Sequence, residues 1–326
     1  FKDKMRSTGK KFLYALCTVY MIISLSFLLI HIMPGKPIMY LVGQEEYYYL
    51  LDQYPAELEA LKLKFGLDDS LWVQYKKYLK CIATLDFGRA YSNHQPVSQN
   101  VLRAAKSTLL LSIPTWILGG ILGAVLGTLA GWRTKGIFDR ITTPFFLFVN
   151  TIPSNCIGLI FLIIFSYKLK IFPINGMVGP GLSGMERFWS LLNHMALPLI
   201  ILVLSRTAGN FMLMKSSVSQ ICNEDYLITA ESKGLEDKKV LFRHVLCNAL
   251  LPYSTSLSIQ LGWLLSGAMI VEVIFGWKGM GSLMFDAVSR RDFPTAQLCF
   301  LISAVSVVAA NWISDIVNII IDPRVR

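Results

Sequence analysis

The sequence has few cysteines and histidines, and their spacing does not indicate a metal site or a disulfide framework. The six cysteines form no Cys-x-x-Cys or Cys-x-x-x-His pattern, and the four histidines are separated along the chain. Zinc sites and disulfide frameworks usually show such close spacing. We therefore expect no metal to be bound by this chain, and we expect the cysteines to be packing residues. The positions are Cys17, Cys81, Cys156, Cys222, Cys247 and Cys299, and His31, His94, His194 and His244.

Charged residues are also scarce, at 16% of the chain, whereas apolar residues make up 54%. With a mean hydropathy of +0.51, this composition is too apolar for a soluble domain and is typical of a polytopic membrane protein. The net charge of +10 does not indicate nucleic-acid binding, because membrane proteins hold an excess of Lys and Arg on the cytoplasmic side. We expect contact with membrane lipid and none with nucleic acid.

Six apolar segments approach the length of about 20 residues that a helix needs to cross a bilayer. The first is long enough to span and lacks the small-x-small cleavage site of a secretory signal, so we expect it to be retained. The sequence therefore predicts an all-α polytopic membrane protein with six transmembrane helices. The segments are 12–33, 107–131, 141–166, 195–214, 254–275 and 295–321.

Lys and Arg gather at the N-terminus, after the second and fourth predicted spans, and in the tail. Such flanks are typically cytoplasmic, so both termini are expected in the cytoplasm. Residues 34–105 then form a small external insert, with exposed tyrosines at 47–49. The predicted division is a cytoplasmic segment with the first transmembrane helix (1–33), the external insert (34–105) and a five-helix transmembrane domain (106–326).

The longest predicted cytoplasmic loop, residues 215–252, has the pattern of two short helices. Asn223 can cap the first helix, and Lys233 lies in its last turn. Gly234 follows as the corner, because glycine adopts a left-handed conformation at little cost. A second helix is expected to begin near Asp237 and to run to the end of the loop. By itself this pattern is compatible with a structured linker or with a docking site.

Residues Thr229–Leu235, Thr-Ala-Glu-Ser-Lys-Gly-Leu, resemble the EAA-type coupling loop of ABC importer permeases. The form is that of the dipeptide, oligopeptide and nickel permease family, in its first-permease (B-type) branch. Ile228 stands where the wider EAA consensus has its leading glutamate, as in the peptide and nickel branch. Further segments resemble the family in the family's own order. They are Asp86–Arg89 with Gln95–Val97, Ile152–Pro153 with Phe172–Gly176, Val271–Gly281, Arg291–Pro294 and Asp322–Arg326.

The resemblance implies a permease subunit of the type I importer fold in the bacterial cytoplasmic membrane, forming half of a translocation pathway for peptides. A nickel or metal-chelate importer of the same family is the alternative. The implied partners are a second homologous permease, two ATP-binding cassette ATPases, and an extracytoplasmic solute-binding protein or lipoprotein.

The resemblance also implies that the loop transmits force from the ATPases. Apolar residues would bury against the ATPase, and charged residues at the rim would set the register. The residues expected to couple are Asp225, Leu227, Ala230, Lys233, Gly234, Leu235 and Lys238.

The chain is not expected to be an enzyme and carries no candidate catalytic residue. The nearest approach to the phosphate-binding pattern GxxxxGK[ST], Gly276 to Ser282, lacks its lysine. ATP and Mg are therefore expected to be used by the partner ATPases, and this chain is expected to bind no cofactor.

Polar residues inside predicted spans mark either a pathway or contacts between helices. As residues that line the translocation pathway, we propose Asn150, Pro153, Gln260 and Glu272. The second predicted span also carries glycines at four-residue spacing from Gly119 to Gly131. This stripe indicates either packing within the chain or a dimer seam, and we expect packing within the chain.

Two other functional classes compete with this interpretation. Gly181-Leu-Ser183-Gly184 matches the GxSG of rhomboid-type intramembrane proteases, with His194 downstream, but its flanking glycines and proline indicate a turn. A secondary transporter usually shows inverted repeats, and no internal repeat is visible in the sequence.

Overall fold

The computed structural model describes residues 2–32, 37–65, 68–227, 234–266 and 268–321. These residues are predominantly helical, and the only strand-type pairing among them is an isolated bridge between Arg89 and Pro96. The chain divides into two compact units, 1–106 with 279–308 and 107–278 with 309–326. The expectation of an all-helical protein is confirmed.

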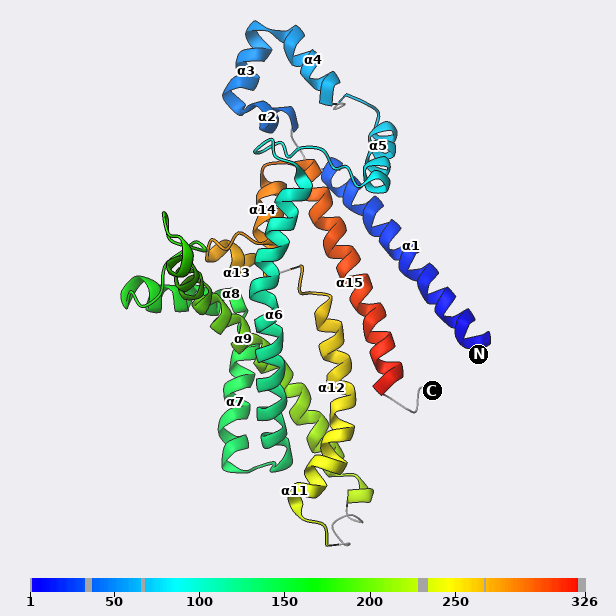
Figure 1. Ribbon diagram of the computed structural model, residues 1–326, viewed down its shortest axis with the longest axis vertical. Coiled ribbons are helices and arrows are strands. Elements are labelled where there is room, and N and C mark those ends of the chain that lie inside the picture. The colour runs from blue at the N-terminus through cyan, green and yellow to red at the C-terminus, as the bar shows by residue number, and fades with distance from the viewer. Residues whose placement is uncertain (1, 33–36, 66–67, 228–233, 267, 322–326) are drawn as a thin grey trace. The chain divides into compact units, whose positions relative to one another are not determined.

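The first unit contains the N-terminal helices and two helices from near the C-terminus (Figure 1). Its main core joins Phe27, Tyr78, Val101 and Leu298. A smaller cluster of Ile38, Tyr47, Leu50 and Leu58 holds the short helices together. The helices are α1 (Lys2–Ile32), α2 (Pro37–Val42), α3 (Gln44–Gln53), α4 (Pro55–Phe65), α5 (Leu71–Thr84), the start of α6 (Val97–Trp132), α14 (Met280–Ser289) and the first half of α15 (Phe293–Ile321).

One detail of the tyrosine run differs from the sequence prediction. Tyr48 and Tyr49 are exposed as predicted, but Tyr47 is buried in the small cluster of the first unit. A helix turns its residues to different sides, and α3 turns Tyr47 toward Leu50 and Leu58.

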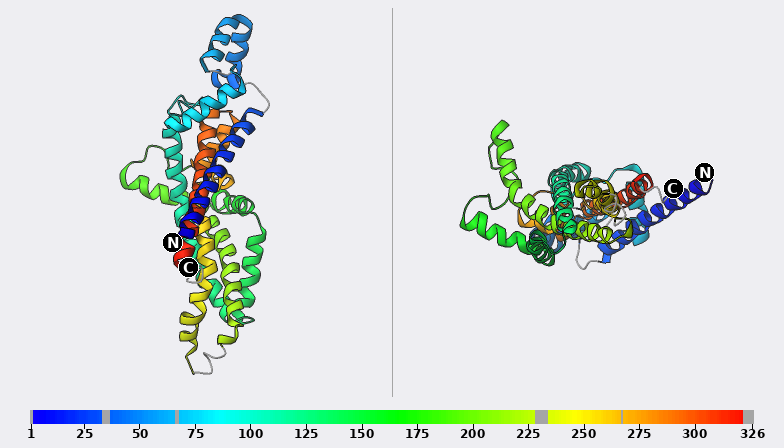
Figure 2. Two further views of the ribbon diagram at one scale, coloured as in Figure 1. Left: turned by 90° about the vertical axis from the view of Figure 1, so that its right-hand side faces the viewer. Right: turned by 90° about the horizontal axis from the view of Figure 1, so that it is seen from below.

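The second unit is built around the long helices α6 and α9. Figures 1 and 2 show α7, α9 and α12 running alongside one another, with α6 beside them. The described elements here are the rest of α6, α7 (Ile137–Thr151), α8 (Ser154–Phe161), η1 (Leu162–Lys168), α9 (Gly184–Cys222), α11 (Asp237–Val240), η2 (Leu241–Val245), α12 (Leu246–Leu261) and α13 (Met269–Ile274).

A stripe of glycines on α6 lets this helix approach α9 closely. A Cβ added at Gly119, Gly123 or Gly127 would lie within 3 Å of a residue of α9, at 2.7 Å from Arg206 Cγ, 2.4 Å from Asn210 Cβ and 2.8 Å from Met214 Cβ respectively. Gly131 continues the stripe against Val218. Small residues are what close helix approach requires. The glycine stripe therefore packs within the chain, as predicted.

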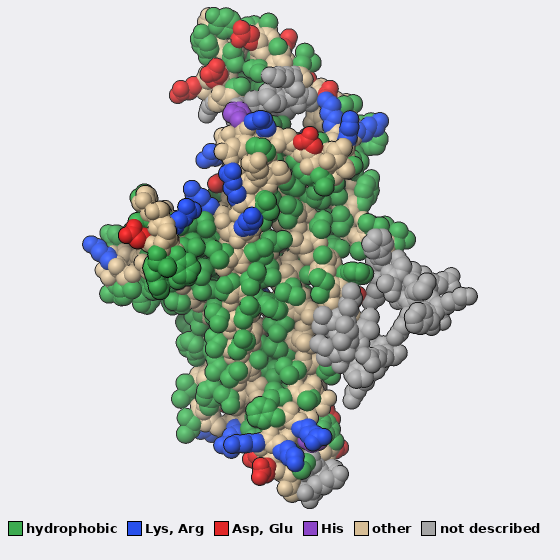
Figure 3. Space-filling model, in the orientation of Figure 1, with side chains coloured by type: hydrophobic (Ala, Val, Ile, Leu, Met, Phe, Trp, Pro, Cys, Tyr) green, Lys and Arg blue, Asp and Glu red, His purple; other side chains and the backbone are tan. Residues whose placement is uncertain are grey.

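Three described helices, α6, α9 and residues 293–315 of α15, are long and apolar enough to cross a membrane. The pair of α7 with α8 and η1 also passes this test, but it bends by 97° between Thr151 and Ser154. On the face seen in Figure 3, hydrophobic side chains cover the flanks of α6 and α7, and charged side chains gather near α11. The protein is therefore a polytopic membrane protein.

Two predicted spans are interrupted. Span 141–166 breaks at Ile152, whose extended backbone agrees with the restriction that a following proline imposes. Span 254–275 divides between the end of α12 at Leu261 and the start of α13 at Met269. Both breaks lie in the second unit.

Candidate functional site: the 215–252 loop and a polar cavity

The predicted first helix of the loop begins differently from the expectation. Helix α9 continues to Cys222, and Asn223 lies at its C-terminal end, where its side-chain amide donates to Ser219 O at 2.9 Å. Asn223 therefore closes α9 and does not cap a new helix. A helical segment begins at Asp225, and residues 228–233, which include Ala230 and Lys233, lie outside the described residues.

Leu227 attaches the segment that begins at Asp225 to the neighbouring helices. Its side chain is 3% exposed and belongs to a cluster with Val218 of α9 and Val240 and Tyr253 of the following helices. The sequence predicted that Leu227 contacts a partner, but its apolar surface is used within the chain. Tyr226 strengthens the attachment, because its hydroxyl accepts a hydrogen bond from Asn248 Nδ2 at 3.1 Å.

Gly234 has the left-handed backbone predicted for the corner, with φ of +72°. A side chain added there would meet no atom of another described residue within 4 Å, so among these residues the glycine is needed for its backbone conformation and not for space. Leu235 is partly buried against the cluster around Leu227. Asp225 and Lys238 are exposed, so their side chains are accessible to a partner.

The predicted second helix begins at Asp237, as expected, and is longer than expected. α11, η2 and α12 follow one another without a gap from Asp237 to Leu261, through Pro252. At a rise of 1.5 Å per residue, such a stretch spans about 35–40 Å. This helical rod therefore begins inside the loop, at Asp237, and ends beyond it, at Leu261.

An ion pair joins α7 to α9 close to the start of the loop. Lys215 Nζ lies 2.5 Å from Asp139 Oδ1, and the two side chains are 21% and 12% exposed. Asp139 also accepts from the Thr143 hydroxyl at 2.6 Å and from the Lys135 amide at 2.9 Å. The Asp139 carboxylate thus interacts with several hydrogen-bond donors at once.

A polar cavity lies in the second unit, between α6, α7, α8, α9 and α12. It has two adjoining lobes of about 550 and 630 Å³, which share Arg206 and Gln260. The first lobe is also lined by Thr115, Asn150, Ser154, Leu202, Ser205, Gly209, Asn210, Leu213, Ser256 and Ala268. The second is also lined by Ser112, Thr115, Leu202, Leu213, Pro252, Thr255, Ser256, Ile259, Trp263, Leu264 and Ala268. Five residues of the second lobe, Pro252, Thr255, Ser256, Ile259 and Gln260, lie on α12, so the rod itself forms part of the wall.

Asn210 and Gln260 connect three helices at this cavity. Asn210 Nδ2 donates to Gly119 O on α6 at 3.2 Å, and Gln260 Nε2 on α12 donates to Asn210 Oδ1 at 2.9 Å. Among the described contacts, Gln260 Oε1 and the hydroxyl of Ser205 are buried and have no hydrogen-bond partner. Buried polar atoms are usually paired, so these two need an explanation.

The structure brings together only part of the predicted pathway residues. Asn150 and Gln260 both line the first lobe. Pro153 is exposed at the bend after α7 and is not among the lining residues. Glu272 is 1% exposed and accepts a hydrogen bond from Thr108 at 2.8 Å, so it is a contact between α13 and α6 and not a lining residue. Arg206 is one of the polar residues inside predicted spans that the sequence marks as either pathway or helix contact, although it was not among the four proposed to line the pathway. Ser205 was not considered from the sequence.

The GxSG segment does not assemble a serine–histidine pair. Ser183 precedes α9 in an extended conformation. The imidazole of His194 instead lies 2.7 Å from Ser190 O and 3.4 Å from its hydroxyl, one turn away on the same helix. This geometry gives no support to the protease alternative.

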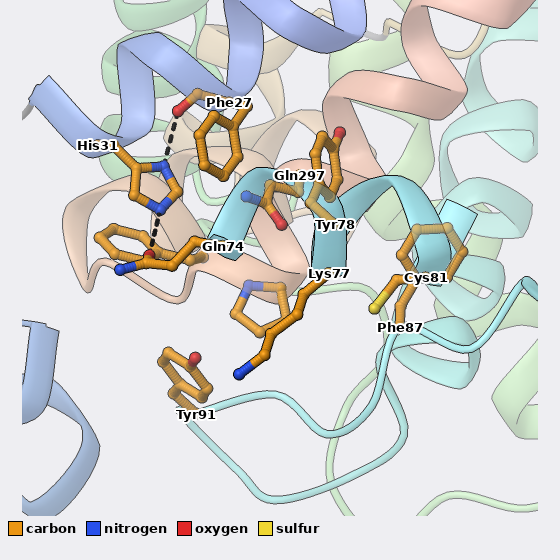
Figure 4. A pocket seen from close by; sticks show the side chains of 11 residues that line it. Phe27, His31, Gln74, Lys77, Tyr78, Cys81, Phe87, Tyr91 and Gln297 are labelled. Atoms are coloured by element: carbon orange, nitrogen blue, oxygen red, sulfur yellow. Dashed lines mark hydrogen bonds between the residues drawn. The ribbon is translucent and has the colours of Figure 1, made fainter. Parts of the chain in front are cut away.

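The first unit has a smaller cavity, of about 200 Å³, between α1, α5 and α15 (Figure 4). Its side is formed by His31, which lies 2.7 Å from Phe27 O and 2.9 Å from Gln74 Oε1 and so links α1 to α5. Burial, and then the charge of Asp292, raise the pKa of Tyr91 to about 12.

Residues 99–326 match the family described as binding-protein-dependent transport system inner membrane component. Among curated proteins, the chain is 33% identical over 304 residues to the oligopeptide transport system permease protein AppB of Bacillus subtilis, which covers 93% of each chain. It is 30% identical over 312 residues to the dipeptide transport system permease protein DppB of Lactococcus lactis, covering 95% of this chain and 96% of the relative. The corresponding DppB of Escherichia coli is 29% identical over 93% of each chain.

Proposed function

This chain belongs to the family of binding-protein-dependent transport system inner membrane components, and from that premise we propose that it is a permease subunit of an ATP-driven peptide importer. The observation that carries the proposal is the helical rod from Asp237 to Leu261, which begins inside the loop and forms part of the wall of the polar cavity toward its other end. This element would connect the docking loop to the pathway.

Peptide is favoured over nickel as the cargo. The two curated relatives with the higher identities cited above are named for dipeptide and oligopeptide transport. The cavity lobes, at about 550 and 630 Å³, fall within the usual range of small-molecule pockets and suit a short peptide. The nickel or metal-chelate alternative has no comparable observation in its favour.

For the topology, we propose six membrane crossings with both termini in the cytoplasm and residues 34–105 outside. Support comes from the distribution of Lys and Arg over the flanks of the apolar segments. Two of the crossings would be bent or interrupted, at Pro153 and between Leu261 and Met269. Interrupted helices are common beside transport pathways, where freed backbone groups can face a cavity.

For the coupling, we propose that the ATPase contacts the loop around Gly234 through its exposed side chains, including Asp225 and Lys238. Displacement of the loop would then pass to α9 and α12 through Leu227 and through the hydrogen bond between Tyr226 and Asn248. Because helices are stiff, the rod would carry that displacement to the cavity wall. The ion pair of Lys215 with Asp139 would move α7 together with α9.

The proposed complex contains a second homologous permease, two ATPases and an extracytoplasmic solute-binding protein. The chain supplies no nucleotide-binding motif of its own. ATP and Mg would therefore be used by the ATPases, and this subunit would bind no cofactor.

Uptake of a radiolabelled dipeptide by cells that carry or lack this chain tests the proposal. We expect uptake only with the chain present, and its loss when ATP is depleted while the ion gradients are clamped. Uptake that survives ATP depletion and follows an ion gradient would support a secondary transporter instead. Chain-dependent uptake of radioactive nickel without any peptide uptake would favour the nickel alternative.

A further inference from the structure

Among the described residues that line the polar cavity, Arg206 is the only arginine or lysine, and it lies within the apolar stretch of α9. Placing a charge inside a membrane span costs several kcal/mol unless the charge is compensated. Among the described residues, however, no Asp or Glu forms a salt bridge with Arg206; the ion pairs found there are Lys77 with Asp69 and Lys215 with Asp139. The compensating anion is therefore to be sought outside this part of the chain.

The fold positions the arginine and does not merely tolerate it. If Gly119 carried a Cβ, that atom would lie 2.7 Å from Arg206 Cγ and 2.8 Å from Arg206 Cβ. The aliphatic part of the Arg206 side chain thus packs directly against the backbone of α6, which restricts the conformations of this side chain. Neighbouring Asn210 is fixed on both sides, by Gly119 O and by Gln260. Such support from packing and hydrogen bonding is what holds a binding group in a defined place.

The polar atoms around Arg206 complement one chemical group in particular. A guanidinium binds a carboxylate through two parallel hydrogen bonds. The unpaired hydroxyl of Ser205 can add a further donor, and the unpaired Oε1 of Gln260 can only accept. The C-terminal residue of a peptide offers a carboxylate together with a backbone N–H close by. It would satisfy the donors and the acceptor at once.

We propose that this cavity binds the C-terminal carboxylate of the peptide during its passage, with Arg206 as the carboxylate ligand and Gln260 as the acceptor for the neighbouring N–H. The proposal rests on the proposed function, because it assumes a peptide as cargo. Apolar residues of the second lobe, Ile259, Trp263 and Leu264, provide a wall beside which different side chains can lie. The site would thus recognise what all peptides share and remain tolerant of their sequence.

The first experiment measures the charge preference of the cavity without any cargo. Ser154, which lines the same lobe, is replaced by cysteine in a Cys156→Ala background, and the assembled transporter is labelled with an anionic and a cationic methanethiosulfonate reagent. We expect Arg206→Gln to lower the ratio of anionic to cationic labelling at position 154 at least about tenfold, since a nearby unit charge is worth several kcal/mol at low effective dielectric. Arg206→Lys should largely preserve the ratio. So should the matched control Arg187→Gln, at an exposed position in the first turns of the same helix.

The second experiment compares uptake of Ala-Phe with uptake of its C-terminal amide by the same variants. We expect Arg206→Gln to reduce uptake of the free acid relative to the amide about tenfold or more, and Arg187→Gln to leave that ratio unchanged. Asn150→Asp provides a second variant with Arg206 intact: the new carboxylate, in the same lobe, should compete for the guanidinium and lower the same ratio.

The two experiments separate the site from the proposed function. An unchanged labelling ratio in Arg206→Gln overturns the anion site, whatever the cargo. An altered labelling ratio combined with equal losses of acid and amide uptake overturns the assignment to the C-terminal carboxylate. If the wild-type transporter takes up neither peptide while labelling still depends on Arg206, the cavity selects anions and both the peptide assignment and the proposed function fail.

Discussion

The Cβ of Asn210 lies only 2.4 Å from the position that a Cβ on Gly123 would occupy. Helix α6 therefore meets α9 through a glycine, at the level where Asn210 also bonds to Gly119 O and Gln260. The close approach of these helices and the polar wall of the cavity are parts of one arrangement.

Replacing Gly123 by alanine should separate α6 from α9. The added methyl group would overlap Asn210 Cβ and crowd the backbone at Phe211 N, 3.1 Å away, and backbone cannot move aside cheaply. Overpacking of this kind costs about 1–3 kcal/mol. We expect a lower midpoint of thermal unfolding for the purified protein in detergent. Gly158→Ala is the control, because its added Cβ would make an ordinary contact of 3.6 Å with Phe275; equal losses in both variants would contradict the prediction.

Leu227→Ala should loosen the loop from the helices. The side chain is 3% exposed and packs with Val240 and Tyr253, and truncating a buried leucine costs about 2–5 kcal/mol. The loss should appear as faster cleavage of the 215–252 loop by trypsin in membranes. Phe242→Ala, at a 66% exposed position nearby, should leave cleavage unchanged. Protection equal to wild type in Leu227→Ala would mean that the loop is attached elsewhere.

Asp139 and Lys215 should be energetically coupled. Each side chain is mostly buried, so removing one partner leaves the other with an uncompensated charge. In a double-mutant cycle of Asp139→Asn and Lys215→Met, measured by unfolding in detergent, we expect a coupling free energy of about 1–3 kcal/mol. The Asp69 and Lys77 pair is the matched control. Its side chains are 35% and 61% exposed, and exposed pairs contribute about 0–1 kcal/mol. A coupling free energy of zero for Asp139 and Lys215 would show that this pair does not link α7 to α9.

Local signals in the sequence predicted local structure well. The left-handed corner at Gly234 and the helix that begins at Asp237 depend on neighbouring residues only, and both are confirmed. The glycine stripe of α6 also predicted correctly that this face packs within the chain. In each case the residue type alone indicates the physical requirement, such as a positive φ or the absence of a side chain.

Burial depends on which distant segments meet, and the sequence alone does not indicate these contacts. Nothing near Leu227 in the chain indicates that Tyr253 covers it, and nothing near Glu272 indicates Thr108, which lies on α6. The cavity wall combines Asn150, Arg206 and Gln260 from three helices. Their polarity within apolar spans was visible in the sequence, but their meeting at one cavity was not. A charged residue within an apolar span was visible in the sequence, but its lack of a partner among the described residues required the fold.

Gly234→Val should uncouple ATP hydrolysis from peptide uptake. At φ of +72° a β-branched residue is strained by about 1–3 kcal/mol, so the corner should relax toward negative φ and turn the preceding segment away from its direction. No other described residue has an atom within 4 Å of the new Cβ, so we expect the effect to come from the backbone and not from a clash with this part of the chain. Gly181→Val is a matched control, because Gly181 has φ of +74° and equally open surroundings in another loop. In proteoliposomes with the complete transporter, we expect Gly234→Val to lower the peptide taken up per ATP hydrolysed at least about tenfold, which corresponds to about 1.4 kcal/mol, and Gly181→Val to leave this ratio near wild type. If both valines lowered the ratio equally, strain alone would explain the loss, and the corner would have no special part in coupling.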